Sequence, residues 1–156
     1  MSGGLWRFAL EVYARPGVEA LLLELQDRHG QSAPFLLWRL WMAAEARPAD
    51  PEILMAAAEL ARGWETVATG PLRALRRAQA GGVARAPAQA LQALRAQVKA
   101  LELEAERMLL EMLEASSPPP SGQPASAPAP ALAEAARVWG GAAPPQLFRR
   151  LSLALA

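Results

Sequence analysis

The sequence contains no cysteine, which excludes disulfide bonds, thiolate metal sites and cysteine nucleophiles. This absence also agrees with a reducing compartment. Histidine occurs once, as His29, near the expected end of a helix. A serine or threonine nucleophile needs an adjacent base that is itself held in place. With a single histidine and no nucleophile-elbow motif, we expect no hydrolase chemistry of this kind.

Residues that favour β-strands are also scarce. Valine, isoleucine, threonine and tyrosine are few, whereas alanine and leucine dominate and the apolar residues recur at helical spacing. The sequence therefore predicts an all-α protein. Its 156 residues fit a single domain, because a chain of this length can bury one substantial core.

The chain has no long hydrophobic run. Its most apolar stretch, Ala33 to Ala44, is too short to span a bilayer and contains Arg39, which favours a buried core helix. The first residues lack the basic start and the apolar stretch of a signal peptide. We therefore expect a cytoplasmic protein.

Helix-start and helix-stop signals predict a single bundle of about five helices in residues 1–115. Ser32 and Asp50, each followed by a proline within the first turn, are typical of helix starts. One helix is expected from Pro51 to about Thr69, where Gly70-Pro71 stops or kinks it. A short helix to about Ala80 and a glycine-containing turn then lead into a long final helix.

The long final helix carries a heptad pattern. Its apolar positions step alternately by three and four residues, and they are Leu91, Leu94, Val98, Leu101, Ala105, Met108 and Met112. Such a seam packs along another helix. The partner is either the segment from Pro51 to Ala80, which gives an intramolecular hairpin, or the same helix of a second copy in a coiled coil.

A proline-rich stretch separates this bundle from the C-terminal residues. Residues 116–130 consist mainly of proline, serine and alanine and are expected to form a disordered linker. Residues 131–156 contain two short helix candidates, which are expected to dock weakly on the bundle through Trp139, Leu147, Phe148 and Leu151. The alternative is that Arg149 and Arg150 hold this segment at a membrane surface.

The charges are unevenly distributed. Residues 1–65 carry six arginines and nine acids (net −3), and residues 102–114 carry five glutamates and one arginine (net −4). Between them, residues 66–101 contain six cations and no acid (net +6). The last stretch, 115–156, has three arginines and one glutamate (net +2). The six cations are the candidate binding residues, and they are Arg73, Arg76, Arg77, Arg85, Arg95 and Lys99.

The hairpin register places these cations at its tip. If the chain turns near Ala84, facing residues have numbers that sum to about 168. By this rule Arg62 lies near Glu106, whereas Arg73, Arg76 and Arg77 have no acidic neighbour on the partner helix. These three arginines are three and four residues apart and can converge on one anion. The alternatives are that acids such as Glu24 or Asp27 neutralise them, or that they are simply solvated.

Metal and nucleotide sites are not expected. Glu102 and Glu106 share a helix face, but no histidine lies three residues from any glutamate, as a bundle metal site would require. Gly81-Gly82 lacks the spacing of the phosphate-binding glycine motifs. We therefore expect no metal and no cofactor.

Several short stretches occur in a characteristic order: LWRFALEVYARPGV, LQDRHG, LLWRLWMAA, then Trp64, PLRALRR and ELEAER. Together they resemble an uncharacterised small family of bacterial proteins known only as a domain of unknown function. The resemblance covers Leu5 to about Leu113. It implies a compact helical domain in the bacterial cytoplasm and supplies no activity, ligand or catalytic residue. Pro34 stands where the family pattern has asparagine.

These observations favour a non-enzymatic adaptor or regulatory protein that binds a partner protein through the basic hairpin tip. The alternative is an anion-binding domain that uses the same arginines for a phosphate-bearing ligand or nucleic acid. Lysine is nearly absent and no tyrosine or phenylalanine is interleaved with the cations, which argues against nucleic acid. An enzyme is the third interpretation. The chain is expected to be a monomer or a homodimer.

Overall fold

The computed structural model describes residues 4–141 and 143–156 and contains no strand in these ranges, which confirms the all-α prediction. No helix in the described ranges is long and apolar enough to cross a membrane. The α-helices are α1 (Gly4–Tyr13), α2 (Val18–His29), α3 (Ala33–Ala44), α4 (Pro51–Trp64), α5 (Gly70–Ala78), α6 (Ala88–Ala115), α7 (Pro128–Trp139) and α8 (Pro145–Ala154). A π-helical turn, Glu65–Thr69, joins α4 to α5, and a 3-10 turn, Gln79–Gly81, follows α5.

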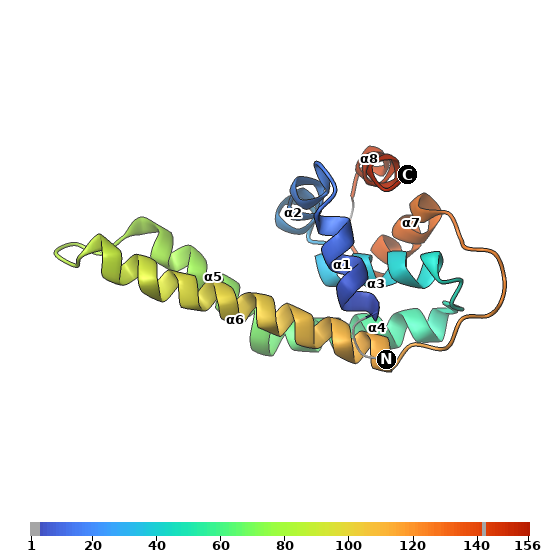
Figure 1. Cartoon of the computed structure of the whole chain (residues 1–156), viewed down its shortest axis with the longest axis horizontal. Helices are drawn as coiled ribbons and strands as arrows, with labels where there is room; N and C mark the ends of the chain where they lie inside the picture. The colour runs from blue at the N-terminus through green and yellow to red at the C-terminus, as the bar shows by residue number, and fades with distance from the viewer. Residues whose placement is uncertain (1–3, 142) are drawn as a thin grey trace.

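The helices form a body with a projecting arm (Figure 1). The body contains α1 to α4, α7, α8 and the second half of α6. We call residues 70–101 the arm: α5, the turn that follows it and the first half of α6. The arm is an antiparallel helical hairpin that extends well beyond the body, so its outer end has no other helix beside it.

The centre of the body is α3. Its apolar side chains face nearly all directions, and all of Ala33 to Ala43 are buried, as the sequence predicts. The expected helix caps are also present. The backbone amide of Phe35 donates to Ser32 Oγ at 3.3 Å, and that of Ile53 donates to Asp50 Oδ1 at 3.1 Å.

The C-terminal segment is part of the core, in contrast to the weak docking expected from the sequence. The ring of Trp139 on α7 lies 5.5 Å from that of Phe35, and its indole donates to the carbonyl of Gly30 at 2.8 Å. Arg39 of α3 donates to Glu134 of α7 at 2.9 Å. The sequence of α7 predicts that it is a helix. It does not predict that α7 covers α3, because that contact depends on which side of α3 the other helices leave uncovered.

The proline-rich stretch is extended but held in place. The amide of Ser121 donates to the carbonyl of Ala46 at 3.0 Å, and the amide of Ser126 donates to the carbonyl of Ala43 at 3.0 Å. The guanidinium of Arg47 donates to the carbonyl of Pro118 at 2.8 Å. The stretch therefore follows the end of α3 over residues 117–126, where disorder was expected, because carbonyls at and just beyond that helix end accept its amides.

Gly70-Pro71 widens the helix instead of stopping it. Pro71 has no amide hydrogen, and its ring would collide with the preceding turn of a regular α-helix. The chain avoids the collision in the π-helical turn, where the Gly70 amide donates to the carbonyl of Glu65, five residues earlier. A Cβ on Gly70 would lie only 2.5 Å from this oxygen, so glycine is required there.

Only some of the apolar residues of the heptad seam are buried inside the hairpin. Val98 and Ala105 are buried against the helices of α4 to α5, and the Trp64 indole donates to the Ala105 carbonyl at 2.8 Å. The structure therefore has the intramolecular hairpin. The alternate positions, Leu94, Leu101 and Met108, remain 45–57% exposed. Pairing with a second copy stays a prediction.

Two glycines in neighbouring turns give a matched test of this geometry. We expect Gly70→Ala to lower the free energy of unfolding, because its methyl group meets the Glu65 carbonyl oxygen. Gly63→Ala meets no atom within 4 Å and should raise it by up to about 1 kcal/mol, since alanine favours the helix. Urea denaturation measures both. Equal effects of the two substitutions would contradict the π-helical turn.

Candidate functional site: the arm and the cleft at its base

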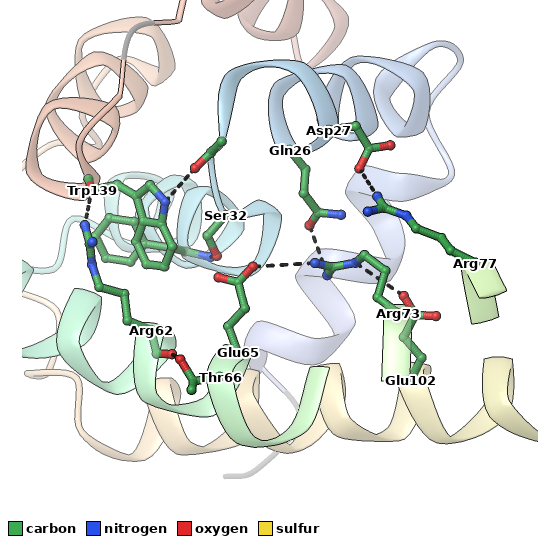
Figure 2. A network of polar contacts seen from close by, with 12 residues as sticks. Gln26, Asp27, Ser32, Arg62, Glu65, Thr66, Arg73, Arg77, Glu102 and Trp139 are labelled. Atoms are coloured by element: carbon green, nitrogen blue, oxygen red, sulfur yellow. Dashed lines mark hydrogen bonds and ion pairs between the residues drawn. The ribbon is translucent and has the colours of Figure 1, made fainter. Parts of the chain in front are cut away.

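The six cations predicted to form one site fall into two groups. Arg73, Arg76 and Arg77 lie on α5 near the base of the arm. Figure 2 shows Arg73 and Arg77 facing Gln26 and Asp27 of α2. Arg85 lies in the turn at the outer end, and Arg95 and Lys99 lie on the outer half of α6. The structure therefore does not bring the six together at one point.

The inner arginines have acidic partners. Arg76 Nε donates to Glu102 Oε2 at 2.6 Å, and these hydrogen bonds raise the pKa of the Arg76 guanidinium. Arg77 Nη2 donates to Asp27 Oδ1 of α2 at 2.9 Å. The expectation that the partner helix offers no acid was therefore wrong. The alternative that Asp27 neutralises the arginines is confirmed for Arg77.

The backbone register holds at the base of the hairpin, where the Trp64 indole reaches the carbonyl of Ala105, next to the predicted Glu104. It missed the acid of Arg76 because side chains do not point straight across a hairpin. In an α-helix long side chains lean towards the helix N-terminus. In an antiparallel pair, the side chains of Arg76 and Glu102 therefore lean towards each other. By backbone register Arg76 was placed opposite Gln92, ten residues before the acid that it contacts.

Arg73 is the centre of a looser network (Figure 2). Its three guanidinium nitrogens face Glu65 Oε1 at 3.5 Å, Gln26 Oε1 at 3.4 Å and Glu102 Oε1 at 3.6 Å. All three distances exceed those of a strong charged hydrogen bond. The Nε atom is buried and has no hydrogen-bond acceptor. Arg73 thus ties α2, the π-helical turn and α6 together electrostatically.

A cleft of about 320 Å³ opens beside this network, and we call it the base cleft. Its walls come from α1, α2, the start of α3, the π-helical turn, α5 and α6. Leu10, Leu23 and Leu103, one from each of three helices, line it and are each about half exposed. Its polar lining consists of Tyr13, Glu19, Gln26, Asp27, Thr69, Arg73, Arg76, Glu102 and Glu106.

A tyrosine–glutamate pair forms part of this lining. The Tyr13 hydroxyl donates to Glu106 Oε1 at 3.0 Å. Burial raises the pKa of the Glu106 carboxyl above its ordinary value, although the Tyr13 hydrogen bond and the Arg73 charge oppose this. Burial and the Glu106 charge also raise the pKa of the Tyr13 hydroxyl. Within the described ranges, Glu106 has no ion-pair partner.

Sequence reasoning did not find this pair. It placed Glu106 opposite Arg62, whereas Arg62 instead donates to the carbonyl of Trp139. Tyr13 and Gln26 were not singled out, because each looks like an ordinary residue of an amphipathic helix. The one available signal was the presence of a single tyrosine in a chain of 156 residues.

The outer cations are different. Arg85, Arg95 and Lys99 form no ion pair with any described residue. A hollow of about 260 Å³ lies at this end, lined in part by Gln79, Val83 and Arg95. Both Arg95 Nε and Gln79 Oε1 are buried without a hydrogen-bond partner. The outer end therefore holds positive charge that the fold does not neutralise.

Comparison with known proteins gives a family but no activity. A family model described as a protein of unknown function (DUF2390) matches residues 4–113. The match extends from α1 nearly to the end of α6, so it includes the arm and the base cleft. It confirms the resemblance to a family of unknown function. No curated protein and no solved structure matches the chain.

The two arginine pairs should differ in strength. The side chains of Arg76 and Glu102 are 25% and 18% exposed, whereas those of Arg77 and Asp27 are 60% and 45% exposed. We expect Arg76→Ala to lower the free energy of unfolding by roughly 1–3 kcal/mol, since the mostly buried Glu102 carboxylate loses its short hydrogen bond and keeps only the more distant Arg73. Arg77→Ala should cost at most about 1 kcal/mol. Similar losses in urea denaturation would refute the internal role of Arg76.

Glu106 should make stability depend on pH. Its carboxylate is disfavoured in the folded chain, so its contribution is fully present below the unfolded pKa of about 4.3 and is lost as pH rises through the raised folded pKa. Glu106→Gln keeps an acceptor for Tyr13 and removes the charge. We expect this variant to melt higher than the wild type at pH 8 and equally at pH 4.

The control is Glu104→Gln, which removes an exposed carboxylate from the same helix outside the base cleft. Its melting temperature should follow that of the wild type across the same pH range. A Glu106→Gln variant that does the same would show that Glu106 is well solvated when it is ionised.

Proposed function

We propose that this chain, which belongs to the DUF2390 family of proteins of unknown function, is a non-enzymatic adaptor or regulatory protein that binds an acidic surface of a partner protein through the outer end of its arm. The observation that carries the proposal is the division of the cations. Arg73, Arg76 and Arg77 have intramolecular partners, whereas Arg85, Arg95 and Lys99 have none among the described residues. We place the protein in the cytoplasm, in agreement with the absence of cysteine.

The outer end also presents apolar surface. Val83 in the turn and Leu94 on α6 are 62% and 50% exposed. Protein interfaces combine an apolar centre with a polar rim, and arginine is enriched in them. An isolated patch of phosphate-binding cations would not need the two apolar side chains.

The backbone of Arg85 supports a role for this end. Arg85 has a φ of 66°, in the left-handed region that favours glycine or asparagine. An L-residue with a full side chain costs roughly 1–2 kcal/mol in this conformation. The exposed turn gives Arg85 no described ion-pair partner that would offset this cost, so its side chain is better explained by an external contact.

The hollow beside Arg95 offers a specific seat for a carboxylate. Arg95 Nε is a buried donor without an acceptor, and a buried unpaired donor is costly unless a partner arrives. A carboxylate side chain of the partner would accept this hydrogen bond and neutralise the guanidinium. Gln79 Oε1, also unpaired, is an acceptor on the same hollow.

The hollow is also compatible with the second candidate function, an anion-binding domain. The phosphate of a small ligand or of a nucleic acid would satisfy Arg95 in the same way. The two candidates differ in their response to salt. Phosphate-dominated binding to nucleic acid weakens steeply with ionic strength, whereas an interface with an apolar centre persists.

The test is capture from lysate of the source cells, with both protein and nucleic acid analysed. The outer variant carries Arg85→Glu, Arg95→Glu and Lys99→Glu. The control variant carries three charge reversals away from the arm, Arg7→Glu, Arg149→Glu and Arg150→Glu, so that both have the same net charge. We expect the wild type and the control to capture one discrete protein, and the outer variant to capture at least about tenfold less of that protein.

Thermal melting checks that both variants are folded. Because the outer cations have no described internal partner, the outer variant should melt close to the wild type. Undiminished capture by a folded outer variant would refute the proposal. Capture of nucleic acid alone, lost between low and moderate salt, would favour the anion-binding alternative.

A further inference from the structure

The base cleft contains carboxylates that the fold leaves without cations. Arg76 is engaged by Glu102, Arg77 by Asp27, and Arg73 is shared among Glu65, Gln26 and Glu102. Glu106 and Glu19 line the same cleft and form no ion pair with a described residue. The charge that remains unneutralised in the base cleft is therefore negative.

Of these two carboxylates, Glu106 is the deeper. Glu19 is exposed at the start of α2, whereas Glu106 is half-buried on α6 and has one hydrogen bond, from Tyr13. Burying a carboxylate without a cation is unfavourable. A bound cation would remove this penalty, and the Tyr13 hydroxyl would hold the carboxylate in position to receive it.

The other part of the base cleft is apolar. Leu10 of α1, Leu23 of α2 and Leu103 of α6 approach from three helices, and each is about half exposed. Single exposed leucines are common on protein surfaces, but three on the walls of one cleft form a continuous apolar lining. A volume of about 320 Å³ lies at the lower end of the range for small-molecule pockets.

We propose that the base cleft binds a small amphipathic amine, whose ammonium group pairs with Glu106 and whose apolar part lies against Leu10, Leu23 and Leu103. This site is separate from the outer end of the arm and does not depend on the function proposed for it. It combines apolar side chains from three helices with an acidic side chain that can fix the orientation of a ligand.

An anionic amphipath fits less well. A carboxylate in the base cleft would approach Glu19, Asp27, Glu102 and Glu106. Arg73 Nε has no hydrogen-bond acceptor, but Arg73 already faces two acids, and Arg76 and Arg77 are each paired with one. A neutral alcohol would fill the apolar walls but would leave Glu106 unpaired. The charge of the head group is therefore the property that decides the ligand class.

Three probes with the same alkyl chain isolate this property: octylamine, octanol and octanoate. Titration calorimetry with the full chain at pH 7.5 measures each affinity below the concentration at which the probe aggregates. We expect saturable one-to-one binding of octylamine, at least about tenfold tighter than binding of either other probe. Equal affinity of the three, tighter binding of octanoate, or no saturable binding of octylamine would overturn the proposal.

Two variants then locate the binding. Glu106→Gln removes the charge and keeps an acceptor for Tyr13, and it should weaken octylamine binding at least about tenfold. Glu104→Gln, on the exposed side of the same helix, is the matched control and should leave the affinity unchanged. Octylamine binding that survives in a folded Glu106→Gln variant would overturn the assignment.

A third variant covers the case in which Glu106→Gln does not fold. Leu103→Ser changes an exposed residue of the apolar lining and is not expected to unfold the chain. It should weaken octylamine binding severalfold, because the alkyl chain loses an apolar contact. An unchanged affinity would show that octylamine binds elsewhere.

Discussion

The widened turn at Glu65–Thr69 is the constraint on which the arm depends. Pro71 cannot continue a regular α-helix, so the chain inserts one extra residue into the turn before it. One additional residue rotates everything that follows by about 100° around the helix axis. The face of α5 that carries Arg73 and Arg77 thereby meets α2, and Arg76 meets α6. The partners of the three α5 arginines depend on this rotation.

The same constraint divides the cations into those that hold the fold together and those that do not. Arginines close to the turn reach acids on α2 and α6, because both helices lie within one side-chain length. Beyond that point the arm extends past the body, and residues 78–101 contain no acid. Charge on the inner half of the arm therefore contributes to folding, and charge on the outer half remains available for association. In the base cleft the unpaired charge is negative, because its arginines form ion pairs and two of its carboxylates, Glu19 and Glu106, do not.

A core centred on α3 supports this arrangement. Helix α3 is apolar on nearly all sides and needs cover from every direction. Helices α1, α2, α4 and α6 provide part of it, and α7 closes the remaining side through Trp139 and the Arg39–Glu134 pair. The family match ends within α6, so this closing helix lies outside the matched region.

The sequence by itself determined the helical class, most helix starts and the central position of α3, because each follows from local spacing, capping residues and proline geometry. For the heptad seam it predicted either a hairpin or a second copy as the partner. It also identified the acid-free segment and the resemblance to a family of unknown function. Only the tertiary structure decided which cations are neutralised, since Asp27 is fifty residues from Arg77 and no local pattern relates them. It likewise decided the ordered course of residues 117–126 and the burial of α7, which depend on carbonyls at and just beyond the end of α3 and on an uncovered core face. The tertiary structure also decided the pairing of Tyr13 with Glu106. These residues lie on helices far apart in the chain, and nothing in the local sequence of either one marks it as part of a pair.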